Sequence, residues 1–312
     1  MPNPRITPAS HLQTDAAPDF NLFTLKLLAQ GDSWFSINGL SLFTASSILM
    51  RSRFTADTIV VNCADPADLL KHMVDWRNDP FFFRYLAAGS NFEEKWDGLL
   101  ISGGGNDLID ALGVLPQDAH GVPRMQAERL LLTPSERAAT GSIERYVSQD
   151  GWAVFRAHML EQYRALETLR ATSARNQGIP IFTHCYAYAQ PRNVGAGPLG
   201  PWLHPALLAY DVPPEDWLAL TRHFIDLLHD EVITRSSLAN LHILDTRALI
   251  PPASPNPGVK DPNWLNEIHP TAKGYDLIAP AFVKMIEDIL LPTGSPIPSP
   301  APVFPGSTLH GG

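Results

Sequence analysis

The sequence predicts a single α/β domain: a three-layer α/β/α sandwich around a parallel five-stranded sheet. Short apolar runs of strand character alternate with longer stretches of helical periodicity, an order typical of parallel strands joined by crossover helices. The 312 residues are 45% hydrophobic, which is ample for a large core and excludes a globally disordered chain. No internal repeat is visible.

Five segments carry the strand pattern, and two carry clear helical spacing. The strands are expected at Leu22–Leu28, Thr58–Cys63, Gly98–Ser102, Ile179–His184 and Leu241–Asp245. The helices are expected at Trp152–Gln177 and Gly274–Leu291, because apolar residues recur there at steps of three and four. Gly178 and Pro180 mark the end of the first helix.

Proline marks the boundaries of the domain. The chain holds 29 prolines, roughly twice the usual share of about 5%. Five of them crowd residues 251–262 and six lie in 292–312, so we expect an irregular loop and a disordered tail. Residues 1–20 are expected to be an irregular N-terminal segment. The domain then covers 21–291, with long insertions at about 111–149 and 189–217 as candidate caps.

Composition and charge exclude several kinds of partner. The formal net charge of −9 gives no electrostatic footprint for nucleic acid. Cys63 and Cys185 are expected to be free thiols, and no cluster has the spacing of metal ligands. There is no apolar run of bilayer length and no signal-peptide pattern. We therefore expect no integral membrane segment. For the chain as written we expect a cytoplasmic location, and export by another route stays open.

The segment after the first strand offers a nucleophile. Ligands of parallel sheets bind beyond the carboxyl ends of the strands, and here the chain reads Gly31-Asp32-Ser33. A serine hydroxyl at the mouth of a helix lies where N-terminal amides stabilise negative charge. The alternative is that Asp32 or Ser33 only caps that helix.

The segment after the third strand offers an amide donor. It holds three glycines followed by Asn106 and Asp107, which let the backbone turn tightly and approach a ligand. Neither glycine-rich phosphate-binding motif is present. The alternative is a glycine-rich turn capped by asparagine.

His269 lies just ahead of the last predicted helix. It directly precedes Pro270, which disfavours helical backbone and keeps the histidine in a loop. A loop histidine in this place suits a general base. The alternative is an ordinary surface or structural histidine, since the chain has 11 of them.

The three motifs form an ordered signature: Gly31-Asp32-Ser33, then the G-x-N-D motif from Gly104 to Asp107, then His269-Pro270. In this order the chain resembles the SGNH, or GDSL, hydrolase family of serine esterases and lipases, over about residues 21–291. The resemblance implies a flavodoxin-like fold and ester hydrolysis with no metal or organic cofactor. The G-x-S-x-G elbow of α/β-hydrolases is absent.

The resemblance assigns a role to each motif. Ser33 would be the nucleophile, and His269 the base that takes its proton and returns it to the leaving alcohol. Asn106 would donate its side-chain amide to the oxyanion, beside the backbone N–H of Ser33. The residues that support these motifs are Gly31, Asp32, Gly104 and Asp107.

A third oxyanion donor in the family is the backbone N–H of a glycine after the second strand. The best match here is Ala67, with Ala64 as the fallback. Alanine also has a backbone N–H, but it disfavours positive φ. We therefore expect Ala67 to serve with a negative φ.

The third member of the triad also departs from the family. Many members have an aspartate three residues before the histidine, and this chain has Asn266 there. An amide oxygen can accept from Nδ1–H of His269 and fix the tautomer, but it lacks the charge that stabilises an imidazolium. A backbone carbonyl could orient His269 instead, leaving a Ser33–His269 dyad. Asp261 and Glu267 are the nearby acids that could substitute.

Other polar residues have a structural interpretation beside the functional one. Asp107 and Asp110 resemble a carboxylate pair for glycoside hydrolysis, but acids at a helix start are favoured by the helix dipole. His184, at the end of the fourth strand, either lines the pocket or is structural.

Aromatic residues allow two interpretations as well. The run Phe81–Tyr85, with Phe92, lines an acyl pocket or belongs to the core. Trp202 and Trp217 lie in the second insertion, where a cap would shape access to the cleft.

We expect a serine hydrolase that cleaves a small-molecule carboxylic ester through an acyl-enzyme. Alternatives within the family are a carbohydrate O-deacetylase, a thioesterase and a lysophospholipase. Alternatives from other classes are a catalytically weak binding protein, motivated by Ala67 and Asn266, and a nucleotide-binding flavodoxin-like protein.

Overall fold

The computed structural model describes residues 3–15, 17–36, 46–90 and 93–291. One sheet of six strands runs through it in the order β1-β3-β2-β4-β5-β6, and every neighbouring pair is parallel. The strands are β1 (Arg5–Pro8), β2 (Leu25–Gly31), β3 (Thr58–Asn62), β4 (Gly98–Ser102), β5 (Ile181–His184) and β6 (Leu241–Leu244). The predicted α/β fold is confirmed, with six strands in place of five.

The additional strand lies in the segment expected to be irregular. Arg5 pairs with Ile59 and Pro8 with Asn62, which adds β1 to the outer edge of β3. A four-residue strand beside prolines shows no alternating pattern, so the sequence hides it. Proline is tolerated there because an edge strand leaves one side unpaired.

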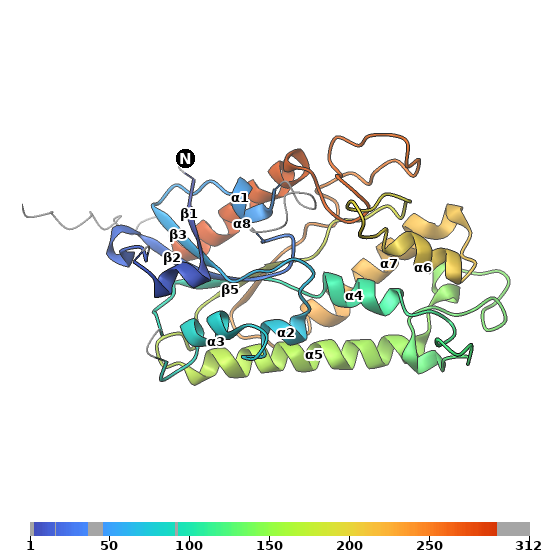
Figure 1. Cartoon of the computed structure of the whole chain (residues 1–312), viewed down its shortest axis with the longest axis horizontal. Coiled ribbons are helices and arrows are strands. Elements are labelled where there is room, and N and C mark those ends of the chain that lie inside the picture. The colour runs from blue at the N-terminus through green and yellow to red at the C-terminus, as the bar shows by residue number, and fades with distance from the viewer. Residues whose placement is uncertain (1–2, 16, 37–45, 91–92, 292–312) are drawn as a thin grey trace, which may run out of the picture.

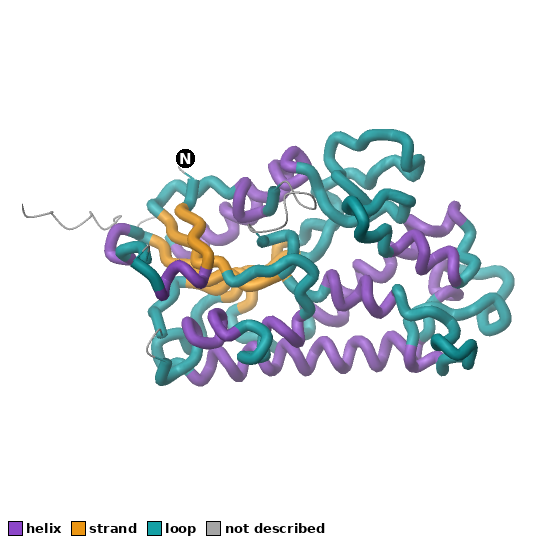
Figure 2. The backbone as a smooth tube through the Cα atoms, viewed as in Figure 1, coloured by secondary structure: helices purple, strands orange, loops and turns teal. Residues whose placement is uncertain are grey.

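Helices cover both faces of the sheet. They are α1 (Ile48–Arg51), α2 (Leu70–Met73), α3 (Pro80–Leu86), α4 (Gly105–Leu112), α5 (Gln149–Thr172), α6 (Leu203–Ala209), α7 (Trp217–Leu227) and α8 (Ala272–Leu290). Helices α1 and α8 lie on one face, and α2, α3 and α5 on the other (Figure 1). Helices α4, α6 and α7 gather beyond one end of the strands, where the predicted site lies (Figures 1 and 2).

The two predicted helices form with shifted ends. Helix α5 begins at Gln149 because the side chain of Ser148 accepts from the N–H of Gly151. It ends five residues earlier than expected, since Asn176 turns away to bind the N–H of Trp96. In α8 the buried face includes Ile278 and Phe282, as predicted.

The irregular loop is present and the tail is not described. Residues 251–262 contain no helix or strand, as predicted, while 292–312 lie outside the described residues. The second insertion contributes α6. Within the described residues, no helix is long and apolar enough to cross a membrane.

Candidate active site

Three predicted residues meet beyond the carboxyl end of β2. Oγ of Ser33 lies 2.9 Å from Nε2 of His269, and Nδ1 of the same ring lies 3.0 Å from Oδ1 of Asn266. All three side chains are buried. Ser33 lies two residues after the end of β2, and the other two lie in the loop that leads into α8. The fold thus brings together residues that are more than 230 positions apart.

The hydrogen bonds fix the tautomer of His269. Oδ1 of Asn266 also accepts from the backbone N–H groups of Ile268, at 3.1 Å, and of His269, at 2.9 Å. Backbone N–H groups only donate, so the atom that they meet is an oxygen. Nδ1 of His269 must therefore carry its proton, which leaves Nε2 free to accept the hydroxyl proton of Ser33.

The alternative acids are engaged elsewhere. Asp261 accepts from the backbone N–H groups of Asn263 and Trp264, at 2.8 and 3.0 Å. Glu267 is 1% exposed, and its carboxylate accepts from four backbone N–H groups, those of Arg192, Trp202, Leu203 and His204. The structure thus brings Asn266, and neither acid, against the imidazole.

Burial determines the basicity of His269. Desolvation lowers the pKa of its imidazole to about 4, because the charged form is disfavoured away from water. The amide of Asn266 adds no charge to offset this. Nδ2 of Asn266 is itself buried and has no hydrogen-bond partner among the described residues. The pair therefore favours a neutral histidine over a wide pH range.

The turn that carries Ser33 is set by its neighbours. Oδ1 of Asp32 accepts from the N–H of Trp34 at 3.0 Å, and the carbonyl of Asp32 accepts from Phe35 and Ser36, which closes one helical turn. A Cβ on Gly31 would lie 2.7 Å from Cβ of Ser102. Ser102 on β4 therefore leaves no room for a side chain at position 31, two residues before Ser33. Asp32 thus caps a turn beside the candidate nucleophile, and the described residues up to Ser36 form no helix there.

Three candidate donors surround the position of an oxyanion. Nδ2 of Asn106 donates to the carbonyl of Asp68 at 3.0 Å, and Asn106 lines the same cavity as Ser33. Within the described residues, the backbone N–H groups of Ser33 and Ala67 have no recorded acceptor. The fallback Ala64 is engaged, since its N–H donates to Oδ1 of Asn62.

The expectation of a negative φ at Ala67 is wrong. Its φ is 63°, in the left-handed region that glycine adopts without cost and alanine adopts at about 1–2 kcal/mol. Ala67 thus holds a conformation that glycine favours and alanine disfavours. Gly104, before α4, has a φ of 103° and meets the same requirement without strain.

Asp107 and Asp110 do not form a pair for glycoside hydrolysis. The buried carboxylate of Asp107 accepts from the N–H of Leu70 at 3.0 Å and so connects α4 to α2, and burial raises its pKa. Asp110 is exposed. Asp107 therefore supports the turn that presents Asn106, which agrees with its expected place in the motif.

A second group of serine, histidine and aspartate side chains lies close to the site: Ser102, His184 and Asp32. In this group the serine, and not the histidine, contacts the aspartate. Oγ of Ser102 donates to Oδ1 of Asp32 at 2.8 Å and lies 3.0 Å from Nε2 of His184. Nδ1 of His184 meets the carbonyl of Cys185 at 2.9 Å, so no carboxylate orients this ring. Ser102 and His184 are fully buried. We infer that His184 is structural.

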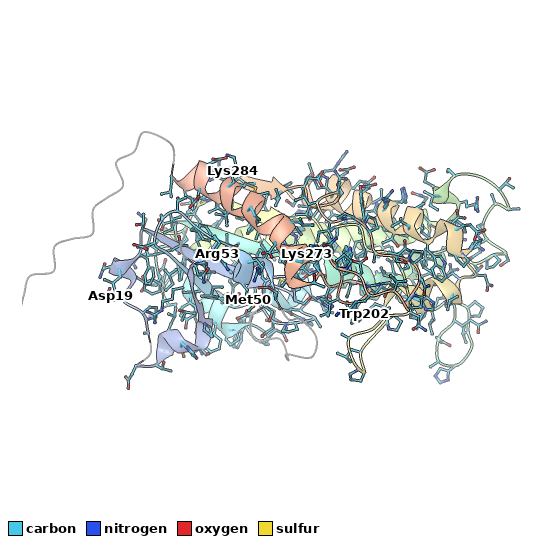
Figure 3. The ribbon with its side chains drawn as sticks, turned by 90° about the horizontal axis from the view of Figure 1, so that it is seen from above. Asp19, Met50, Arg53, Trp202, Lys273 and Lys284 are labelled. Carbon is cyan, nitrogen blue, oxygen red and sulfur yellow. The ribbon has the colours of Figure 1, made fainter. Side chains whose placement is uncertain are left out.

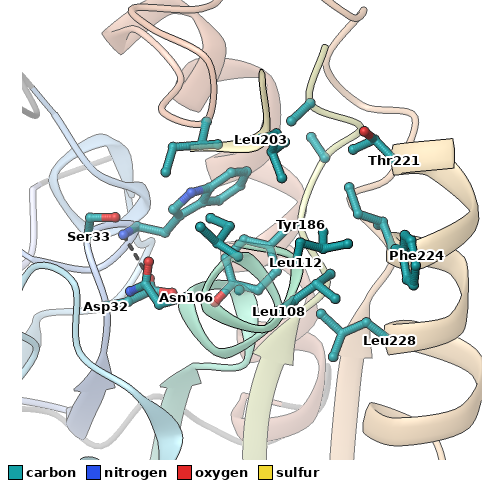
Figure 4. Close-up of a pocket in the computed structure, with 17 residues that line it drawn as sticks. Asp32, Ser33, Asn106, Leu108, Leu112, Tyr186, Leu203, Thr221, Phe224 and Leu228 are labelled. Carbon is teal, nitrogen blue, oxygen red and sulfur yellow. Dashed lines mark hydrogen bonds between the residues drawn. The ribbon is translucent and has the colours of Figure 1, made fainter. Parts of the chain in front are cut away.

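A cavity opens beside Ser33, and Figure 4 shows its lining. Its volume is about 50 Å³. Most of its walls are apolar side chains from α4, α6, α7 and the π-helical segment Leu228–Ile233 that continues α7. These side chains are Leu108, Ile109, Leu112, Leu203, Phe224, Ile225 and Leu228. Asp32, Trp34 and Tyr186 complete it near the serine.

The predicted aromatic candidates mostly lie elsewhere. Phe82 and Tyr85 belong to the core, Phe83 is exposed, and Phe92 lies outside the described residues. Trp217 is buried, and its indole N–H donates to the carbonyl of Val212. Trp202 alone approaches the candidate triad: its ring meets that of His269 edge to face, with centroids 5.6 Å apart. In Figure 3 it lies beyond the end of α8 marked by Lys273.

Sequence reasoning did not predict Tyr186 at the site, and it did not predict the structural role of Glu267. The hydroxyl of Tyr186 donates to Asp32, and Glu267 fastens the loop of His269 to α6. Neither residue stands in a recognisable motif. The spacing of Leu108, Ile109 and Leu112 did mark an apolar face on α4 that a search for a pocket could have used.

The parallel sheet and the contact between Ser33 and His269 agree with what the resemblance to the SGNH, or GDSL, hydrolases implies. No family model matches its sequence, and no curated protein does. The resemblance therefore rests on the motifs and on the geometry of these residues.

Three solved structures show a distant likeness to this chain. An acetyl-xylooligosaccharide esterase mutant from Geobacillus is 15% identical, with 84% of this chain and 94% of that chain covered and a TM-score of 0.37. A GDSL-like lipase from Bacteroides thetaiotaomicron is 9% identical, with coverages of 86% and 90% and a TM-score of 0.36. A protein from Slackia heliotrinireducens assigned as an SGNH hydrolase is 14% identical, with coverages of 84% and 98% and a TM-score of 0.40.

Proposed function

We propose that the protein hydrolyses carboxylic esters through an acyl-enzyme on Ser33. The observation that carries this is the 2.9 Å contact between Oγ of Ser33 and the unprotonated Nε2 of His269. A serine hydroxyl becomes a useful nucleophile when a base accepts its proton. Asn266 supports this by holding the imidazole in the tautomer that the reaction needs.

The chemistry proceeds in two halves. Oγ of Ser33 attacks the ester carbonyl carbon while its proton passes to Nε2 of His269. The tetrahedral intermediate collapses, the carbon–oxygen bond to the alcohol breaks, and His269 returns the proton to the leaving oxygen. Water then repeats the sequence on the acyl-serine and releases the acid. These side chains and water suffice for every step.

The oxyanion of the intermediate would be held by Asn106 and by the backbone N–H groups of Ser33 and Ala67. The amide of Asn106 has two N–H donors. The contact with Asp68 uses one, so the other is available while the first holds the side chain in place. Removal of one oxyanion donor typically costs about 2.7–4 kcal/mol, or 10²–10³ in kcat.

Hydrolysis of nitrophenyl esters tests the proposal. We expect the wild type to release nitrophenol and Ser33→Ala to lose nearly all of that activity. Asn106→Ala should retain the fold and lose about 10²–10³ in kcat. Equal turnover by wild type and Ser33→Ala would contradict the proposal, because the hydroxyl of Ser33 is its only nucleophile.

A further inference from the structure

Resting on this function, we propose that the cavity beside Ser33 binds the acyl chain, and that the preferred substrates are esters of unbranched aliphatic acids of about four to six carbons. The carbonyl carbon would lie at Ser33 and the chain would run into the cavity. The alcohol would lie on the other side of Ser33, toward His269 and Trp202.

The cavity leads away from the nucleophile. In Figure 4, Ser33 and Asn106 lie at one end, Leu108 and Leu112 in the middle, and Phe224 at the far end. An acyl group on Ser33, with its oxygen toward Asn106, would point its chain along this direction. Phe224 is 1% exposed and lies across the far end of the cavity, where it limits the length of the chain.

The lining selects for apolar chains. The polar groups near the mouth belong to Asp32, Ser33, Trp34, Asn106 and Tyr186. Asp32 accepts from Ser102 and from Tyr186. Beyond them only Thr221 has a polar side-chain atom among the described lining residues. A charged or polyhydroxylated acyl group would leave its polar atoms unpaired there, which is costly.

The volume sets the length. About 10–15 Å³ of cavity space accepts one water-sized group, and a methylene has a similar size. The cavity of about 50 Å³ therefore accepts about three to five such groups beyond the carbonyl carbon, which matches acids of about four to six carbons. Burial of each methylene should raise kcat/KM about fourfold, since it contributes about 0.8 kcal/mol.

The position of His269 decides which side of Ser33 takes the acyl chain and which takes the alcohol. His269 must return its proton to the alcohol oxygen, so the alcohol leaves on the side of His269. His269 and Trp202 are not among the described residues that line the cavity. Trp202 instead lines a neighbouring and more open groove with Pro201, Pro205 and Asp110, and Ile109 lies between the two. The alcohol would lie toward this groove.

A chain-length series tests the proposal. The kcat/KM of nitrophenyl esters from acetate to decanoate is measured for wild type, Leu112→Phe, Leu203→Ala and a matched control. The control is Leu208→Ala, the same substitution on the same helix at a side chain that is 51% exposed, while Leu203 is 5% exposed and lines the cavity. Circular dichroism verifies that each variant is folded.

For the wild type, we expect kcat/KM to be highest for the esters from butanoate through hexanoate. It should be tenfold or more above the kcat/KM for acetate. Leu112→Phe should lower the hexanoate-to-acetate ratio at least tenfold, and Leu203→Ala should move the optimum to longer chains. Leu208→Ala should keep the wild-type profile. If Leu112→Phe does not fold, the shift in Leu203→Ala decides alone.

Failure of the acyl pocket and failure of the proposed function give different results. A wild type that prefers acetate, with the same profile in every folded variant, overturns the acyl pocket while a fluorophosphonate still labels Ser33. Absence of that labelling together with an active Ser33→Ala overturns the proposed function itself.

Discussion

The side-chain oxygen of Asn266 accepts from Nδ1 of His269 at 3.0 Å. An uncharged amide thus takes the place of the aspartate that many SGNH hydrolases have. It orients the imidazole without stabilising its protonated form, so the candidate base of this protein combines a fixed tautomer with a low pKa.

The pH dependence of the wild type follows from that combination. Burial lowers the pKa of His269 to about 4, and only the neutral ring can accept a proton. We expect kcat/KM for a nitrophenyl ester to stay constant from neutral pH downward and to fall only near pH 4. Circular dichroism at each pH separates loss of fold from protonation. An acid limb near 6.5, the ordinary pKa of histidine, would contradict the assignment.

Asn266→Asp should move that acid limb upward. A carboxylate beside the imidazole stabilises its charged form, and an adjacent opposite charge typically shifts a pKa by about 1–3 units. The limb of kcat/KM is therefore expected between about pH 5 and 7. Asn256→Asp, in the exposed proline-rich loop, adds the same charge elsewhere and should keep the wild-type profile. The same limb in both variants would show that residue 266 does not face the base.

Ala67→Gly should stabilise the protein and leave ester hydrolysis intact. Glycine accepts a φ of 63° without strain, while the strain of alanine there is about 1–2 kcal/mol. Part of this gain is offset by the larger entropy of glycine in the unfolded chain, so we expect about 0.5–1 kcal/mol in urea unfolding. Ala111→Gly inside α4 should lose about 1 kcal/mol. If both variants lost the same free energy of unfolding, the strain at Ala67 would be contradicted.

Glu267→Gln should loosen the loop of His269. The carboxylate accepts from four backbone N–H groups, and a carboxamide offers only one oxygen. A hydrogen bond to a charged group contributes about 1.5–3 kcal/mol, so unfolding should become easier by at least that amount, with a lower kcat. Thermal unfolding and ester kinetics measure both effects. The control is Glu215→Gln, at an exposed glutamate. Equal changes in stability and kcat in the two variants would contradict a role of Glu267 in holding the loop.

The sequence predicted the parts of the site that depend on chain order. Ser33, Asn106 and His269 each follow or precede an element whose pattern is readable, and parallel strands necessarily end at one edge. Asn266 was predicted from the resemblance, because many members of that family have an aspartate three residues before the histidine.

The remainder depends on contacts that no local pattern records. The edge strand Arg5–Pro8 is stabilised by pairing with β3, and its own residues show no alternation. The left-handed turn at Ala67 is imposed by its surroundings against the preference of alanine. The carboxylate of Glu267 finds its donors in a segment more than sixty positions away, so its role could not be read from the loop alone.

The central claim is that Ser33 is the nucleophile and Ser102 is not. The direct measurement is intact mass after reaction with a fluorophosphonate, for wild type, Ser33→Ala, Ser102→Ala and His269→Ala. The account predicts one adduct on wild type and on Ser102→Ala, none on Ser33→Ala, and strongly slowed labelling of His269→Ala. An adduct on Ser33→Ala that disappears in Ser102→Ala would contradict it.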